Sequence, residues 1–178
     1  MVQIEGWWQP ALNAKGLSQG DVVNRIPFCT ASAPVRPLQW TQMRGGRDAW
    51  GEVEKPILRD QRKHFLAHGD ILPGLVISHS CELDNQNSGG KVLMAPVALI
   101  DTLESALRTT VIEQKHLALM PLPELPTLGT SYADLRLIIA VPRALVLDSE
   151  RLASMTDAAL HRLYAQVFKF IMRKDPGF

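Results

Sequence analysis

Residues able to do chemistry follow one another in the stretch Ser78-His79-Ser80-Cys81-Glu82, at the end of an apolar run. The thiolate is the reactive form of cysteine, and a neighbouring imidazole favours it. Cys81 beside His79 therefore predicts nucleophilic chemistry of the kind that cysteine hydrolases use. The alternative is structural, because free cysteine is among the most buried residue types and fits a strand as a small core residue.

The same stretch is predicted to close a strand over residues 74–82, which a polar, Gly-rich turn joins to a second strand at 91–99. In an extended strand, side chains two residues apart share a face, so His79 and Cys81 are predicted to point the same way. The opposite face is predicted to carry a polar edge, with Glu82 as a candidate catalytic group. Its members are Ser78, Ser80 and Glu82.

A second polar group lies in the stretch SYADLR. Tyr132, Asp134 and Arg136 are each two residues apart, which places them on one face of an extended run leading into a strand predicted near 133–141. The structural interpretation is a contact between Asp134 and Arg136. The functional hypothesis is that both belong to a catalytic groove, where Arg136 supplies positive charge beside Cys81.

Basic residues and tryptophans alternate after the first predicted strand, which covers residues 21–30. Arg and Trp side chains together can hold a phosphate and stack a base, which suits single-stranded nucleic acid. The alternative is a solvated loop whose tryptophans anchor it. The candidate nucleic-acid-binding residues are Arg36, Trp40, Arg44, Arg47 and Trp50.

Two histidines are spaced as zinc ligands can be. His64 and His68 are four residues apart on a short helix predicted around residues 56–67, and His79 or Cys81 would have to complete a site. A solvated helix face is the alternative, because structural zinc sites usually contain Cys/His doublets and the chain has 2 cysteines. We therefore predict no metal and no other cofactor.

The composition and net charge of the chain restrict the class of protein in which these candidate residues lie. A chain of 178 residues with 46% hydrophobic and 21% charged residues predicts one globular domain over residues 1–178. A formal net charge of +1 gives no overall field for nucleic acid or membrane, so electrostatic recognition must come from a local patch. The N-terminal residues do not resemble a signal peptide, and no apolar run reaches the ~20 residues of a membrane span. We expect a cytoplasmic protein without a membrane partner.

The patterns along the chain predict a mainly β fold with α additions. Residues 31–50 are predicted to form a long loop or insertion, and a helix begins near residue 101. A further strand is predicted near 116–121. The chain then ends in an amphipathic helix that Thr156 caps.

The order of GDVV, a long loop, LPGLVISHS, VLMAPVAL and a terminal amphipathic helix resembles the MazF/PemK family of toxin endoribonucleases. The resemblance covers roughly residues 17–30 and 70–172. It implies a small SH3-like (PemK-type) barrel with a helical insertion at 31–69 in the first long loop and a C-terminal helix. It also implies a homodimer, and single-stranded RNA or an antitoxin-like protein as partner.

Two residues depart from this family. The resemblance places an Arg before the proline of the second strand and a Thr at the end of the third, both in the RNA-cleaving site, whereas this chain has Leu72 and Ala98. Neither replacement can donate a hydrogen bond from its side chain. The resemblance thus implies the barrel and RNA binding more than endoribonuclease activity. The alternatives are a cysteine-dependent hydrolase that uses Cys81 and His79, or a non-enzymatic protein-interaction module.

Overall fold

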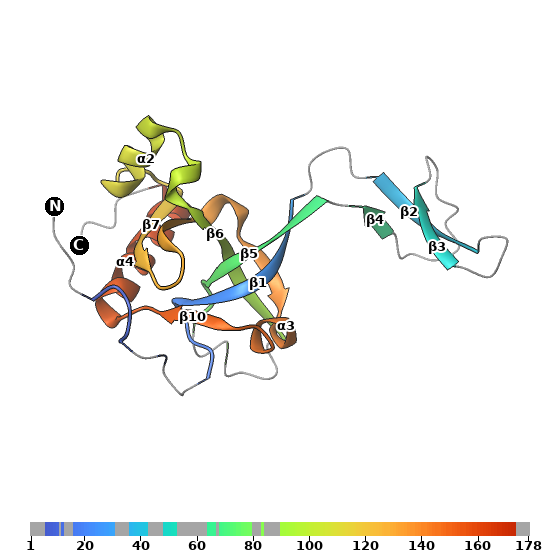
Figure 1. Ribbon diagram of the computed structural model, residues 1–178, viewed down its shortest axis with the longest axis horizontal. Helices are drawn as coiled ribbons and strands as arrows, with labels where there is room; N and C mark the ends of the chain where they lie inside the picture. The colour runs from blue at the N-terminus through green and yellow to red at the C-terminus, as the bar shows by residue number, and fades with distance from the viewer. Residues whose placement is uncertain are drawn as a thin grey trace. The chain divides into compact units, whose positions relative to one another are not determined.

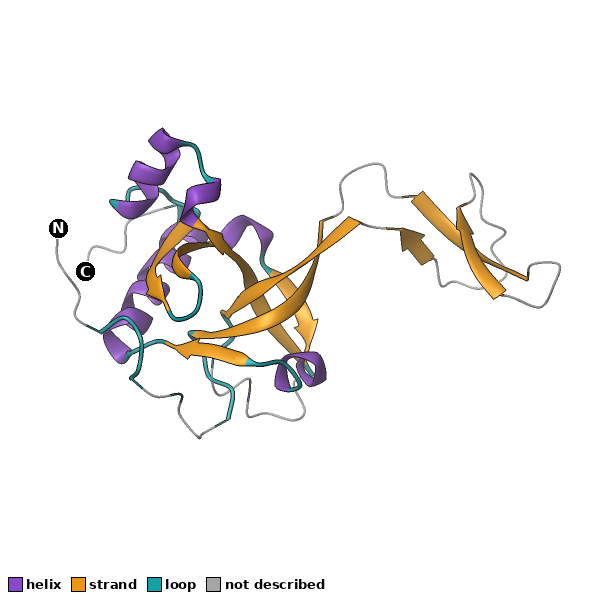
Figure 2. Ribbon diagram, in the orientation of Figure 1, coloured by secondary structure: helices purple, strands orange, loops and turns teal. Residues whose placement is uncertain are grey.

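The computed structural model of the chain describes residues 6–10, 12, 16–30, 36–42, 48–52, 64–66, 68–79, 83 and 90–173. The chain divides into a main unit, Met1–Ile26 with Ile71–Phe178, and a small unit, Pro27–Asp70. Strands form most of the regular structure, and helices are added in the main unit (Figure 2). The mainly β fold with α additions is therefore confirmed.

Figure 1 labels most of the elements. Their bounds in chain order are β1 (Asp21–Thr30), β2 (Arg36–Gln42), β3 (Asp48–Glu52), β4 (His64–Leu66), β5 (His68–Val76), β6 (Lys91–Leu99), η1 (Ile100–Thr102), α2 (Ser105–Ile112), β7 (Leu119–Leu125), β8 (Gly129–Asp134), η2 (Leu135–Leu137), β9 (Ile139–Pro142), α3 (Arg143–Leu147), β10 (Arg151–Ser154) and α4 (Asp157–Met172).

Within the described residues, the larger sheet has seven strands in the order β10-β1-β5-β6-β8-β7, and β9 also pairs with β6. Strand β6 is central, and its pairings with β5, β8 and β9 are all antiparallel. Its bounds agree with the predicted strand at 91–99. Because β8 and β9 pair with different parts of β6, the short connection between them, η2, is held close to this central strand.

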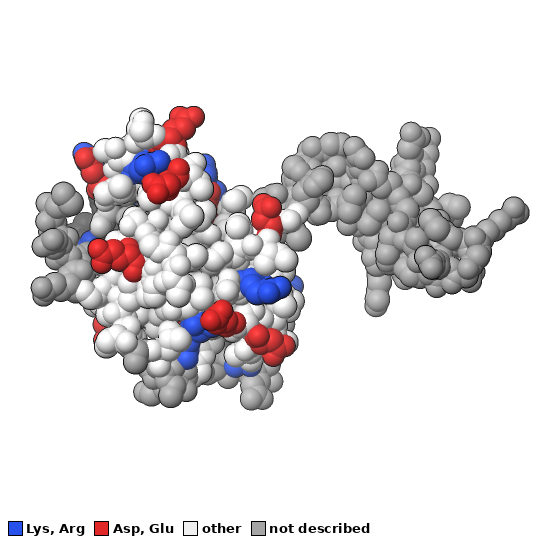
Figure 3. All heavy atoms as spheres, viewed as in Figure 1, with Lys and Arg blue, Asp and Glu red and all other residues white. Residues whose placement is uncertain are grey.

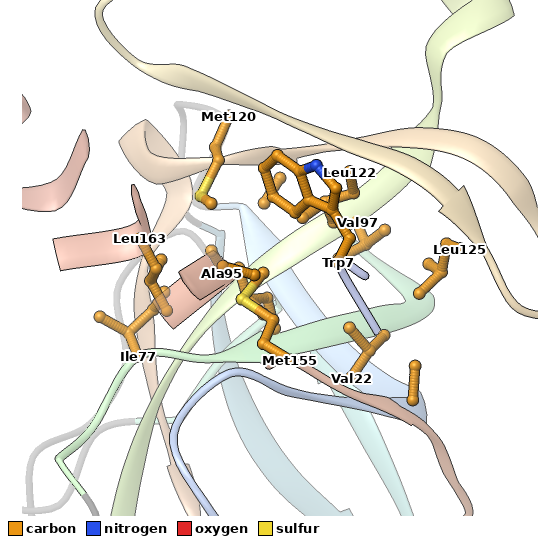
Figure 4. Packing of buried hydrophobic residues seen from close by; sticks show 14 of the residues in the cluster. Trp7, Val22, Ile77, Ala95, Val97, Met120, Leu122, Leu125, Met155 and Leu163 are labelled. Atoms are coloured by element: carbon orange, nitrogen blue, oxygen red, sulfur yellow. The ribbon is translucent and has the colours of Figure 1, made fainter. Parts of the chain in front are cut away.

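The main core lies between the sheet and helix α4. Figure 4 shows Ala95 and Val97 of β6 packed with Trp7, Met155 and Leu163, among other buried apolar side chains. Helix α4 begins where the sequence predicts, since the Thr156 side chain accepts a hydrogen bond from the Ala159 amide at 3.4 Å. The cap satisfies an amide that has no partner inside the helix. The terminal helix is therefore confirmed.

An ion pair fixes the start of β1. The Asp21 side chain is 1% exposed and accepts hydrogen bonds from the Ser18 amide at 2.8 Å and the Ser154 hydroxyl at 2.7 Å. Arg151 Nη1 lies 3.1 Å from Asp21 Oδ2. Because Ser154 and Arg151 belong to β10, this carboxylate joins the two strands.

The described part of the small unit corrects two predictions. A three-stranded sheet in the order β3-β2-β4 replaces the predicted loop at 31–50 and the helix at 56–67 wherever these residues are described. Strand β4 pairs with β2, placing His64 opposite Leu38. The ladder gives these residues backbone hydrogen-bond partners that a short isolated helix, marginal by itself, would have to form internally.

Two strand boundaries also differ from prediction. Strand β5 ends at Val76 rather than near residue 82, because the Ile77 and Ser78 amides both donate to the Leu93 carbonyl and the Leu83 amide donates to the His79 carbonyl, which turns the chain. The strand predicted near 133–141 is divided into β8, η2 and β9. The prediction that Arg136 lies on a continuous strand face is therefore wrong, whereas the predicted facing of Cys81 and Glu82 concerns residues outside the described ranges.

Candidate functional site

The predicted contact between Asp134 and Arg136 is present, but on a turn. Asp134 ends β8 and caps η2, because its Oδ1 accepts a hydrogen bond from the Arg136 amide at 3.0 Å. The same oxygen accepts from Arg136 Nε at 2.9 Å, and Oδ2 accepts from Nη2 at 2.6 Å. A two-residue spacing thus produces a fork-to-fork pair, whereas on an extended strand it would only put both side chains on one face.

The two partners differ in exposure. The Asp134 side chain is 10% exposed and that of Arg136 is 59% exposed. The hydrogen bond to Asp134 raises the pKa of Arg136 above its ordinary value, so the guanidinium stays charged. Its Nη1 group has no hydrogen-bond partner among the described residues. Both Asp134 oxygens accept hydrogen bonds from Arg136, so the carboxylate is poorly placed to act as a base. Arg136, in contrast, presents a cation of fixed orientation to solvent.

His116, which the sequence reasoning missed, belongs to the same part of the molecule. Its Nδ1 accepts hydrogen bonds from the amides of Ala118 at 3.2 Å and Leu119 at 2.9 Å. Leu119 is paired with Asp134 in the ladder between β7 and β8. Partial burial and the charge of Arg136 lower the pKa of His116, while Asp134 acts in the opposite direction. The imidazole is thus a neighbour of the Asp134–Arg136 pair.

The turn that carries His116 is attached to helix α4. Gln166 Nε2 donates to the carbonyls of His116 at 2.8 Å and of Leu117 at 2.7 Å. One turn earlier in α4, Arg162 Nη1 donates to Gln114 Oε1 at 3.2 Å. The terminal helix therefore supports this turn as well as closing the main core. We call His116, Asp134 and Arg136 the His–Arg site.

Ala98, one of the two residues at which the sequence departs from the pattern of the resembled family, lies on the strand next to the one that carries Asp134. Ala98 on β6 is directly opposite Tyr132 on β8, two residues before Asp134. The register of β5 and β6 pairs Gly74, two residues after Leu72, with Pro96, two residues before Ala98. Strands β6 and β8 thus bring Ala98 next to the strand that carries Asp134.

The first candidate stretch has a different character. Ser78 is buried, and its hydroxyl oxygen accepts a hydrogen bond from the Leu93 amide at 2.8 Å. Gln19 Nε2 donates to the Ile77 carbonyl at 2.8 Å, and Arg143 Nε donates to the carbonyl of the buried Leu83 at 2.9 Å. These contacts fix the chain on both sides of the proposed nucleophile. His79 is exposed while Ile77 is buried, so they do not share a core-facing side. Cys81 and Glu82, like Ser80, lie outside the described residues.

The other candidates lie in the small unit. His64 is in β4 and His68 in β5, so the predicted helical spacing of two imidazoles is wrong. Over the described ranges, no group of three His, Cys, Asp or Glu residues is arranged to hold a metal ion. Trp40 lies opposite Trp50 in the ladder of β2 and β3, and Arg36 opens β2. Arg44 and Arg47 lie outside the described residues.

Charge on the visible face of the main unit is mixed. Figure 3 shows basic and acidic side chains close to one another, separated by uncharged areas. A phosphate contact on this unit would therefore depend on individual cations, because paired carboxylates cancel much of a general field. No helix in the described part of the chain has the length and apolar character needed to cross a membrane.

Comparisons with models of known protein families and with curated proteins gave no match to this chain.

Proposed function

We propose that this chain is a MazF/PemK-like protein with an SH3-like barrel, that it binds single-stranded RNA, and that Arg136 contacts a phosphate. The observation that carries the proposal is the exposed guanidinium of Arg136, which Asp134 holds in a fixed orientation. Arg matches the geometry of phosphate oxygens and keeps its charge at every physiological pH. A cation held before its ligand arrives loses less rotamer freedom on binding.

The proposal favours binding over cleavage. Leu72 and Ala98 offer no side-chain donor where the resemblance expects Arg and Thr. The Asp134 carboxylate already accepts three hydrogen bonds from Arg136, so it has little capacity left to take a proton from a ribose hydroxyl. We propose a homodimer, in keeping with the resemblance, in which each subunit carries one His–Arg site. An antitoxin-like protein is the second partner that the resemblance supports.

The test compares RNA affinity in charge-matched variants. Fluorescence anisotropy of a short labelled polyuridine is measured with the wild type, Arg136→Ala, Arg136→Lys and Lys91→Ala. Lys91 is exposed at the start of β6, opposite Pro142. Its substitution by Ala removes one positive charge, as Arg136→Ala does, but away from the His–Arg site. We expect Arg136→Ala to weaken binding about 10- to 100-fold, as for loss of a hydrogen bond to a charged group. Lys91→Ala should change it less than about 2-fold.

Two outcomes would overturn the proposal. One is equal affinity loss in Arg136→Ala and Lys91→Ala, which would reduce Arg136 to a general charge. The other is absence of RNA binding by the wild type at low salt, where phosphate contacts are strongest. Incubating unlabelled RNA with the wild type and Cys81→Ala completes the test. Cleavage that Cys81→Ala abolishes would assign the chain to the cysteine-dependent class.

A further inference from the structure

The position of His116 fixes which of its nitrogens can carry a proton. Nδ1 accepts from two backbone amides, Ala118 and Leu119, so it must present a lone pair. Protonating Nδ1 would direct an N–H bond at two other N–H bonds and break both contacts. The neutral imidazole therefore carries its proton on Nε2, where it is a hydrogen-bond donor.

Backbone contacts keep the segment that carries His116 next to the segment that carries Arg136. The Leu135 amide donates to the Ala118 carbonyl at 2.9 Å, and Leu119 is paired with Asp134. The two segments that carry His116 and Arg136 are thus joined by two backbone contacts, one made by Ala118 and the other by Leu119. Nε2 of His116 has no hydrogen-bond partner within the described ranges, as is true of Nη1 of Arg136.

We propose that His116 and Arg136 bind the same phosphodiester group of RNA, with His116 as a neutral hydrogen-bond donor and Arg136 as the cation. The inference rests on the proposed RNA binding and adds a second, uncharged ligand contact to it. A neutral donor contributes less affinity than a cation, but it fixes the direction from which a phosphate oxygen approaches.

The arrangement predicts how binding responds to pH. An ordinary histidine strengthens phosphate binding as pH falls through about 6.5, because it becomes a cation. His116 resists this change, since its cation would lose both backbone contacts. The other charged groups near His116 have partners within the protein. Asp134 and Arg136 are paired with each other, as are Glu113 and Lys115 on its own segment. On α4, Arg162 donates to Gln114.

Two substitutions distinguish the role of His116 Nδ1, the acceptor of the backbone amides, from that of Nε2, the proposed donor to phosphate. In His116→Asn, the amide oxygen can replace Nδ1 as acceptor for the backbone amides, as Asn does in turns, while the Nε2 donor is lost. In His116→Gln, the longer amide can restore a donor near Nε2 but leaves the backbone amides without their acceptor. We expect His116→Asn to keep the wild-type melting temperature and to weaken polyuridine binding about 5-fold. His116→Gln should melt lower and lose less affinity.

The outcomes distinguish this inference from the proposed function. If Arg136→Ala weakens binding and His116→Asn does not, RNA binding stands and the role of His116 is wrong. If neither substitution has an effect, RNA binding at this site fails as well. Wild-type affinity should change less than about 2-fold between about pH 6 and 8. A steep gain in affinity toward the acid end that His116→Asn removes would show a cationic imidazole and overturn the neutral-donor assignment.

Discussion

The main unit contains two Asp–Arg pairs that use the same chemistry in different surroundings. In the pair of Asp21 and Arg151, the side chains are 1% and 21% exposed, and the carboxylate also bonds to β10 and to a backbone amide. In the pair of Asp134 and Arg136, the carboxylate is nearly buried while the guanidinium is 59% exposed. The first pair joins two strands, whereas the second presents a cation to solvent.

The difference shows why an ion pair by itself does not indicate a site. What matters is where the remaining hydrogen-bonding capacity of each partner goes. Asp21 has two further donors around it, both from the protein. Arg136 has a guanidinium edge for which the described part of the chain provides no acceptor. Substitutions in each pair separate a contribution to stability from a contribution to binding.

The largest effect is expected from Asp21→Ala. The substitution leaves Arg151 without its carboxylate and removes the acceptor of the Ser18 amide and the Ser154 hydroxyl. Breaking a buried pair from one side typically costs about 3–5 kcal/mol, and we expect a value near the lower end because Arg151 is partly exposed. Urea unfolding measures it, with Asp148→Ala at an exposed position as control. A loss below about 1 kcal/mol, as is typical of an exposed ion pair, would show that the Asp21–Arg151 pair does not serve stability.

Gly20→Ala tests the backbone that places Asp21. Gly20 has φ of +82°, and an added Cβ would lie 2.5 Å from Leu160 Cδ2 and 3.0 Å from Met155 Cβ. We expect a loss of about 2–3 kcal/mol, from the left-handed conformation and the overpacking together. Gly90→Ala is the matched control, since φ is +64° there with nothing within 4 Å of the new Cβ. Equal losses in both variants would exclude the packing contribution and leave only backbone strain.

Helix α4 and the start of β1 could be predicted because short-range features of the sequence determine them. The cap at Thr156 and the helical period predicted α4, and the first strand predicted from residue 21 begins there as β1. The small unit's strands were missed because Arg and Pro obscure the alternation of β2, and pairing with β3 and β4 determines the structure there. Tertiary hydrogen bonding also overrode the apolar run that predicted β5 to continue beyond Val76.

The candidate site was only half visible in the sequence. The spacing of Asp134 and Arg136 correctly suggested a contact, because two residues apart is also the spacing of a side chain that caps its own turn. His116 gave no such signal. Its role depends on two amides that follow it and on the register that brings Leu119 opposite Asp134, which is a contact distant in sequence.

A moderate effect is expected from Asp134→Ala. The Arg136 amide loses its acceptor and the guanidinium loses its orientation, but Arg136 can remain hydrated because it is exposed. We expect the unfolding free energy to fall by about 1–2 kcal/mol, less than for Asp21→Ala, because leaving an exposed cation unpaired carries little desolvation penalty. Urea unfolding of the two variants under the same conditions makes the comparison direct. A larger loss for Asp134→Ala than for Asp21→Ala would reverse the assignment of the two pairs.

The smallest effect concerns the pH dependence of stability at His116. Burial and Arg136 lower its pKa in the folded protein, so between that pKa and the unfolded value near 6.5 the unfolded state binds more protons. The stabilising contribution is complete above about pH 6.5 and is lost as pH falls through the folded pKa. Urea unfolding of the wild type and His116→Asn from about pH 8 to 5 should therefore show similar stabilities near pH 8 and a wild type that becomes less stable than His116→Asn toward acid.

His161→Asn on the exposed side of α4 controls for the general effect of replacing a histidine. A wild-type advantage over His116→Asn that grows toward acid would mean that the folded protein holds the additional proton. The Nδ1 contacts with Ala118 and Leu119 could not then persist, because a protonated Nδ1 cannot accept from either amide. Such a result would make the imidazole a second cation beside Arg136. The positive charge that the exposed Asp134–Arg136 pair presents to solvent would then increase toward acid, whereas the buried Asp21–Arg151 pair would not gain a neighbouring cation in this way.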